Sequence, residues 1–144
     1  MVANMELVIL ESKDEITFDG INQLTESVGW GKCFHQTEEK WRHILAVSTH
    51  IAYIKKNDKL IAFGRILEDG IMCMFYDVCV HPNYQGQGIG SRLMNHLIDK
   101  IKNKEYISIG LFAWEGNETA SEFYSKLGFE HVSAMELKKH MKKF

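Results

Sequence analysis

The chain has 144 residues, of which 45% are hydrophobic and 25% are charged, with a formal net charge of −2. This length and composition predict one globular domain over residues 1–144, and the near-neutral charge speaks against nucleic-acid binding and disorder. We expect no membrane contact, because no apolar run is long enough to span a bilayer and no signal peptide is evident. Three scattered cysteines favour reduced thiols and a cytoplasmic location.

The first third of the chain predicts one strand and two helices. Met5–Glu11 is a short apolar stretch that favours a strand. Apolar residues in 17–28 are spaced by 3, 3 and 4, which is typical of an amphipathic helix, and Gly29 ends it. A second helix is predicted to begin at Thr37, where an imperfect capping box has Lys40 in the position of its acid.

The middle of the chain predicts three strands. Ile51–Lys55 and Leu60–Ile66 are apolar runs joined at Asn57-Asp58, a hairpin signal without its usual glycine. Ile71–Val80 follows as a long strand.

The last part predicts two helices and two strands. The apolar face of the first helix is Ile89, Leu93, Leu97, Ile98 and Ile101. Tyr106–Trp114 is predicted as a strand, Thr119–Lys126 as a helix ended by Gly128, and Phe129–Leu137 as a final strand. This order of elements alone indicates the α/β or α+β class.

The most informative segment lies between the strand that ends at Val80 and the helix that begins near Ile89. It contains the only proline, Pro82, and glycines at positions 86, 88 and 90. Glycine leaves the backbone open to a ligand, and the amides at a helix N-terminus are unpaired and carry partial positive charge. Such a loop holds phosphate or pyrophosphate, so we expect a phosphorylated cofactor.

Two familiar phosphate loops do not fit this spacing. A P-loop needs a lysine after its last glycine, but Gly90 is followed by Ser91. A dinucleotide fingerprint needs a different glycine spacing. The pattern Gln/Arg-x-x-Gly-x-Gly/Ala, met by Gln85, Gly88 and Gly90, resembles the coenzyme A loop of the GNAT superfamily of acyl-CoA-dependent N-acyltransferases.

A second segment supports this resemblance. Residues 117–130 are similar to the Asn…Ala…Phe-Tyr…Gly-Phe signature of the same superfamily. Together with the element order, the resemblance covers most of residues 5–137. It implies a mixed sheet of about six to seven strands with helices on both faces, splayed where acetyl-CoA binds, and no metal.

The resemblance also implies which residues bind the cofactor. Pantetheine would pair with the strand before the loop, where a bulge lets the Val78 amide reach the thioester carbonyl; simple core packing is the alternative for Val78 and Val80. Asn117 would bond the cofactor's amide groups or, alternatively, cap the following helix. The predicted cofactor-binding set is Val78, Cys79, Val80, Gln85, Gly86, Gln87, Gly88, Ile89, Gly90, Ser91, Asn117 and Tyr124.

Two residues are predicted to be catalytic. Tyr124 matches the general acid of the family, since a phenol stays protonated while it faces a thiolate, although plain helix packing is the alternative. The glutamate that serves as base in some members is replaced by Met74. We expect deprotonation of the amine through water, with Asp77 as the leading carboxylate. Other titratable candidates are Glu68, Glu115, His35 and His81.

The acceptor site is predicted around Trp30 and Phe34, which would flank an apolar or aromatic amine; burial in the core is the alternative. We therefore expect an N-acetyltransferase that moves an acetyl group from acetyl-CoA to a primary amine of a small molecule in a ternary complex, and a homodimer. The alternatives are acetylation of protein N-termini or lysines, and a non-catalytic acyl-CoA-binding module.

Overall fold

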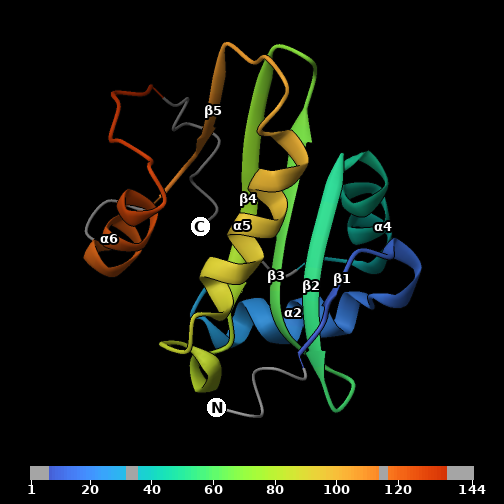
Figure 1. Cartoon of the computed structure of the whole chain (residues 1–144). Coiled ribbons are helices and arrows are strands. Elements are labelled where there is room, and N and C mark those ends of the chain that lie inside the picture. Colours follow the sequence, from blue (N-terminus) through green and yellow to red (C-terminus); the bar gives the residue numbers. More distant parts are fainter. Residues whose placement is uncertain (1–6, 32–35, 114–116, 136–144) are drawn as a thin grey trace. The chain divides into compact units, whose positions relative to one another are not determined.

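The computed structural model describes residues 7–31, 36–113 and 117–135 (Figure 1). The chain forms two compact units, Met1–Phe112 and Ala113–Phe144, which are taken one at a time here. The prediction of a single domain stays a prediction. The first unit contains β1 (Ile9–Leu10), η1 (Lys13–Glu15), α2 (Phe18–Ser27), α4 (Glu38–Val47), β2 (His50–Lys56), β3 (Lys59–Glu68), β4 (Met72–Val80), η2 (Pro82–Tyr84), α5 (Ile89–Ile101) and β5 (Ser108–Leu111); the second contains α6 (Glu118–Lys126).

The first unit is built on a mixed sheet with strand order β1-β2-β3-β4-β5. The pairs up to β3–β4 are antiparallel, and β4–β5 is parallel. The predicted mixed α/β fold is confirmed, with five strands in the described residues rather than six or seven.

One predicted strand is not found. Phe129–Leu137 was expected to be the last strand, but its described part, residues 129–135, has no strand structure, and residues 136 and 137 lie outside the described ranges. A strand needs a hydrogen-bonded neighbour, and the described part of the second unit contains no other strand. Val132 is 85% exposed and Met135 fully exposed, so neither side chain is buried as one face of a strand in a sheet would be.

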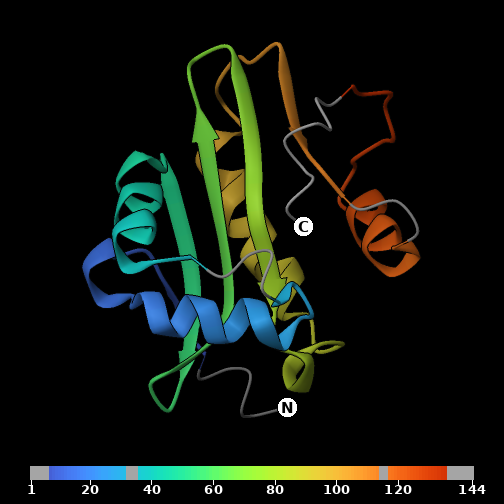
Figure 2. The same cartoon turned by 180° about the vertical axis from the view of Figure 1, so that it is seen from behind.

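Helices cover both faces of the sheet, as predicted. Helix α5 lies over one face (Figure 1), and α2 lies over the other (Figure 2). On the second face one apolar cluster joins α2 and α4 to the strands; it comprises Ile16, Ile21, Leu24, Trp41, Leu45, Ile51, Tyr53, Leu60, Phe63 and Cys79. Of the helices in the described ranges, each is too short or too polar to cross a bilayer.

Local sequence explains where the elements begin and end. The side chain of Thr17 accepts a hydrogen bond from the amide of Gly20, which caps α2. Thr37 caps α4 in the same way through the amide of Lys40, so half of the capping box suffices. The turn between β2 and β3 is formed by Asn57 and Asp58 with φ of 53° and 62°, as a hairpin turn of this type requires.

The N-terminal strand is fastened to α5 by polar contacts. Arg92 Nη2 donates to the carbonyl of Leu7 at 2.9 Å. Glu11 Oε2 lies 2.5 Å from His96 Nε2 and 2.6 Å from Lys100 Nζ. These contacts hold the lysine close to the carboxylate and lower the pKa of Glu11.

Two cysteines of β4 have no disulfide and are buried. They are Cys73 and Cys79. Burial raises the pKa of the Cys73 thiol to about 11, and full burial together with nearby Asp77 raises that of Cys79 further. Both side chains therefore serve as small apolar core residues.

Candidate active site

Strand β4 carries a bulge in its second half. Asp77 and Val78 together oppose the single residue Gly64 on β3. Asp77 has a φ of 57°, in the left-handed region that side-chain-bearing residues seldom adopt. On either side of the bulge the strands pair as Phe63 with Cys79 and as Arg65 with Tyr76. The resemblance placed a bulge at this point, and the structure contains one.

Past the bulge, one edge of β4 has no partner strand among the described residues of the first unit. Strand β5 pairs with β4 only over Met72–Phe75, whereas β3 follows β4 as far as Val80. The pairing of β4 with β5 therefore ends before the half of β4 where the resemblance implies splaying, and the splaying itself stays a prediction. The amide of His81 donates to the carbonyl of Ile61 at 2.7 Å. Because backbone groups alternate along an antiparallel pair, those of Val80 point away from β3, toward the open edge.

The glycine loop leads from this edge to the N-terminus of α5. Gly86 and Gly88 have φ of 76° and 79°, and no atom lies within 4 Å of where their Cβ atoms would be. Gly88 is the N-cap of α5 and has no side chain to satisfy the first amides of the helix. The first amides of α5 thus receive no side-chain cap from Gly88, and the two glycines leave open space beside them, which fits a diphosphate.

Gln85 fixes the start of this loop. Its Nε2 donates to the carbonyl of Val80 at 2.9 Å, and its own amide donates to the carbonyl of Pro82. Ile89 is buried under the loop, so only its backbone could meet a ligand. Of the residues predicted to form the cofactor loop, Gln85 and Ile89 therefore hold the loop in shape.

Asp77 is part of an ion pair that the sequence reading missed. Arg65 Nε lies 2.6 Å from Asp77 Oδ2, and the two side chains are only 13% and 9% exposed. Burial raises the pKa of Asp77 although the Arg65 charge and hydrogen bond oppose this. The available signal was a single cation inside the apolar run Leu60–Ile66, where a charge needs a partner.

The remaining candidates for the base have ordinary structural surroundings or lie outside the described residues. Glu68 accepts a hydrogen bond from Gly70 in the turn at the opposite end of β4 from the loop. His81 Nδ1 accepts from the amide of Asn83, and desolvation lowers the His81 pKa. Glu115 and His35 are not among the described residues.

The predicted acceptor residues are only partly described. Phe34 lies outside the described ranges. Trp30 is half-buried and packs against the apolar cluster between α2 and the sheet. Its amide donates to the carbonyl of Thr25, and that of Gly29 (φ 88°) to Glu26, which closes α2 with a glycine cap. Trp30 is therefore partly a core residue, which was the alternative interpretation, and its role in acceptor binding stays a prediction.

In the second unit, Asn117 and Tyr124 belong to one helix. Asn117 is the N-cap of α6, and its Oδ1 accepts from the amide of Ala120 at 3.1 Å. The capping alternative is therefore confirmed, while the cofactor contact stays a prediction. The ring of Tyr124 packs edge-on against Phe123 and Phe129, with centroids 5.1 and 5.8 Å away.

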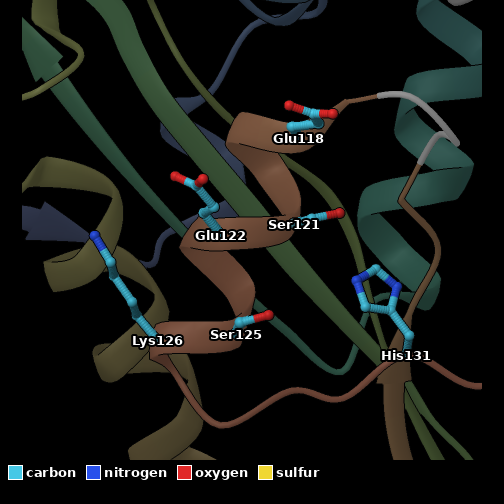
Figure 3. Close-up of a pocket in the computed structure, with 6 residues that line it drawn as sticks. All are labelled: Glu118, Ser121, Glu122, Ser125, Lys126 and His131. Carbon is cyan, nitrogen blue, oxygen red and sulfur yellow. The ribbon is translucent and has the colours of Figure 1, made fainter.

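The second unit also has an open hollow of about 600 Å³ beside α6. It is lined by Glu118, Ser121, Glu122, Ser125, Lys126 and His131. Figure 3 shows the two serines projecting toward the side of His131, while Glu122 and Lys126 project the other way. The hollow is shallow and its lining residues have polar or charged side chains, and Tyr124 does not line it. No group of three or more potential metal-ligating side chains occurs within the described ranges.

A sequence model of the acetyltransferase (GNAT) family matches residues 16–129. The chain belongs to this family. An uncharacterised N-acetyltransferase of Porphyra purpurea is 35% identical over 127 residues, which cover 85% of the chain and 70% of that protein. The ribosomal protein bS18-alanine N-acetyltransferase of Escherichia coli K12 is 29% identical over 83 residues, covering 56% of the chain and 54% of that enzyme.

Solved structures agree with the family assignment. A protein of unknown function from meticillin-resistant Staphylococcus aureus superposes with a TM-score of 0.78 at 26% identity, over 92% of this chain and 98% of that one. The crystal structure of the S18-alanine N-acetyltransferase from Escherichia coli gives 0.73 at 20% identity, over 88% and 79%. The latter likeness concerns the fold alone.

Proposed function

We propose that this GNAT-family protein transfers an acetyl group from acetyl-CoA to a primary amine of a small molecule. The observation that carries the proposal is the run from the open edge of β4 at Val80, through the glycine loop, to the uncapped start of α5. The edge offers strand-like pairing to a pantetheine arm, and the loop offers amides to a diphosphate. Coenzyme A carries both groups in this order.

In this proposal, acetyl-CoA supplies an activated acetyl group as a thioester. The backbone from Gly86 to Ser91 binds the diphosphate, and the Val78 amide donates to the thioester oxygen, where negative charge develops. Asp77 receives, through water, the proton that the ammonium form of the acceptor loses before the neutral amine attacks the thioester carbon. The Oη of Tyr124 gives a proton to the sulfur as the carbon–sulfur bond breaks.

The acceptor is proposed to be an aromatic or long-chain primary amine. Trp30 supports this, because it follows the end of α2 and its half-buried ring keeps part of its apolar surface exposed. A protein N-terminus is the second candidate, favoured by the relative that acetylates an alanine of ribosomal protein bS18. An open peptide groove would suit that acceptor better than an aromatic wall.

Acetyl-CoA turnover, followed as release of the free thiol, tests the proposal across a panel of acceptors. The panel should hold arylalkylamines, alkylamines, amino sugars, lysine peptides and a peptide that begins with alanine. The highest kcat/KM is expected for the first two groups. A higher value for either peptide would replace the small-molecule acceptor with a protein. Binding of acetyl-CoA without turnover on any amine would favour a binding module.

A further inference from the structure

The bulge in β4 contains a residue in an unfavourable conformation. Asp77 has a φ of 57°, which costs a side-chain-bearing residue free energy, although aspartate tolerates it better than most. Such a conformation persists only where surrounding contacts hold it. The neighbouring Val78 is the residue whose amide the proposed function assigns to the thioester oxygen. The contacts that hold Asp77 therefore also orient that amide.

Arg65 makes those contacts. Its Nε hydrogen bonds to Asp77 Oδ2 at 2.6 Å, and its guanidinium lies 4.8 Å from the ring centre of Tyr76. Its Nη1 is 3.5 Å from the hydroxyl of Ser48 at the end of α4. One planar group thus contacts both the bulged residue and the residue before it. A planar guanidinium keeps such an arrangement better than a flexible ammonium would.

Gly64 completes the bulge from the opposite strand. A Cβ at this position would lie 3.4 Å from Val78 Cγ2 and 3.1 Å from Leu97 Cδ1. The absent side chain at Gly64 leaves room for Val78 to pack toward α5. Arg65, the next residue of β3, holds Asp77. Two consecutive residues of β3 therefore shape the bulge.

We propose that Arg65 is a positioning residue for acetyl-CoA: its ion pair with Asp77 holds the β4 bulge in the form that directs the Val78 amide to the thioester. This inference rests on the proposed function. It does not require Arg65 to touch the substrate. In this proposal the Arg65–Asp77 ion pair is part of the cofactor site. A pair that only stabilised the fold would have no effect on acetyl-CoA binding in a folded protein.

The test uses a double variant, Arg65→Met with Asp77→Asn, because removal of one partner would leave a buried charge and could unfold the protein. The double variant leaves no buried charge, and asparagine, like aspartate, tolerates the positive φ at position 77. Arg42→Met is the matched control, since it removes an exposed arginine of α4 that pairs with Glu38. Thermal unfolding confirms that each variant is folded.

Two readouts are measured in the full chain: the dissociation constant of acetyl-CoA by calorimetry, and the shift of the Val78 amide signal in ¹H–¹⁵N spectra when acetyl-CoA is added. We expect the folded double variant to bind at least fivefold more weakly and to lose most of the Val78 shift, while Arg42→Met behaves like the unaltered protein. Unchanged affinity and an unchanged Val78 shift in the double variant overturn the role of Arg65. Failure of the unaltered protein to bind acetyl-CoA overturns the proposed function, and this inference with it.

Discussion

The side-chain amide of Gln85 hydrogen bonds to the carbonyl of Val80 at 2.9 Å, so the glycine loop is fastened to the last residue of β4. Val80 thereby connects two parts of the candidate site. Its strand edge faces open space, and its carbonyl holds the start of the loop that reaches α5.

Gly88→Glu is expected to raise the KM for acetyl-CoA at least tenfold, about 1.4 kcal/mol. The added carboxylate would stand at the helix start where the diphosphate is proposed to bind, and a positive φ strains any side chain there. Steady-state kinetics measure the effect. Gly70→Glu is the control, because Gly70 also has a positive φ and open surroundings but lies in the distant β3–β4 turn. Equal KM values for the two variants would refute the loop assignment.

Tyr124→Phe is expected to lower kcat by about 100-fold, the low end for loss of a general acid. The affinity for acetyl-CoA should change little, because the ring and its packing against Phe123 and Phe129 remain. Single-turnover kinetics and calorimetry separate the two quantities. Full turnover in this variant would leave Tyr124 with a packing role only.

Trp30→Ala is expected to raise the KM for the amine by an amount equivalent to about 1–3 kcal/mol, if the ring forms a wall of the acceptor site. The acetyl-CoA dissociation constant should stay the same. Val28→Ala is the matched control, since Val28 packs against the same apolar cluster. A similar change in KM with both substitutions would show that the loss comes from the core and that Trp30 is no contact residue.

The kcat/KM for the amine is expected to rise between pH 7 and 9. Most alkylamines are protonated at pH 7, and a buried Asp77 with a raised pKa is a base reached through water. Asp77→Asn should lower kcat/KM across the range, measured in a preparation that thermal unfolding shows to be folded, because this change leaves the buried Arg65 without its partner. The profile is measured at saturating acetyl-CoA. A flat profile in the unaltered protein would argue against a proton loss that limits the rate.

Glu11→Gln is expected to flatten the acid side of the stability profile. Lys100 and His96 lower the pKa of folded Glu11 below its ordinary value of 4.5. The stabilisation is therefore present above the unfolded pKa and is lost as the pH falls through the folded pKa. Melting temperatures from pH 3 to 7 measure this, with Glu38→Gln as the control for an exposed pair. An unchanged slope would mean that the N-terminal strand is not held by this carboxylate.

The sequence was sufficient where structure depends on neighbouring residues. Glycines at 86 and 88 predict the loop because positive φ is a local property, and Asn57-Asp58 predicts its turn for the same reason. The Arg65–Asp77 pair could not be found in this way, since it joins two strands across a shift in register. The strand expected over 129–137 is absent from its described part, 129–135, because an apolar pattern does not show which neighbour will pair with it.

Trp30 illustrates a second limit. An aromatic residue after a helix-ending glycine has the same pattern whether it lines a substrate pocket or covers a core. Only its contact with the apolar cluster separates the two, and that contact is made by residues distant in sequence. Asn117 is similar, since both capping and ligand binding favour the same side chain.

Cys73 and Cys79 can also record how often the sheet opens. Thiols react with aromatic disulfide reagents as thiolates, and the raised pKa values of these two buried groups leave them almost entirely protonated near pH 8. Labelling of either side chain therefore requires local or global opening of β4. The labelling rate would report the free energy of opening of the strand that is proposed to bind pantetheine. Protection that increases when acetyl-CoA is added would link the stability of this strand to its ligand.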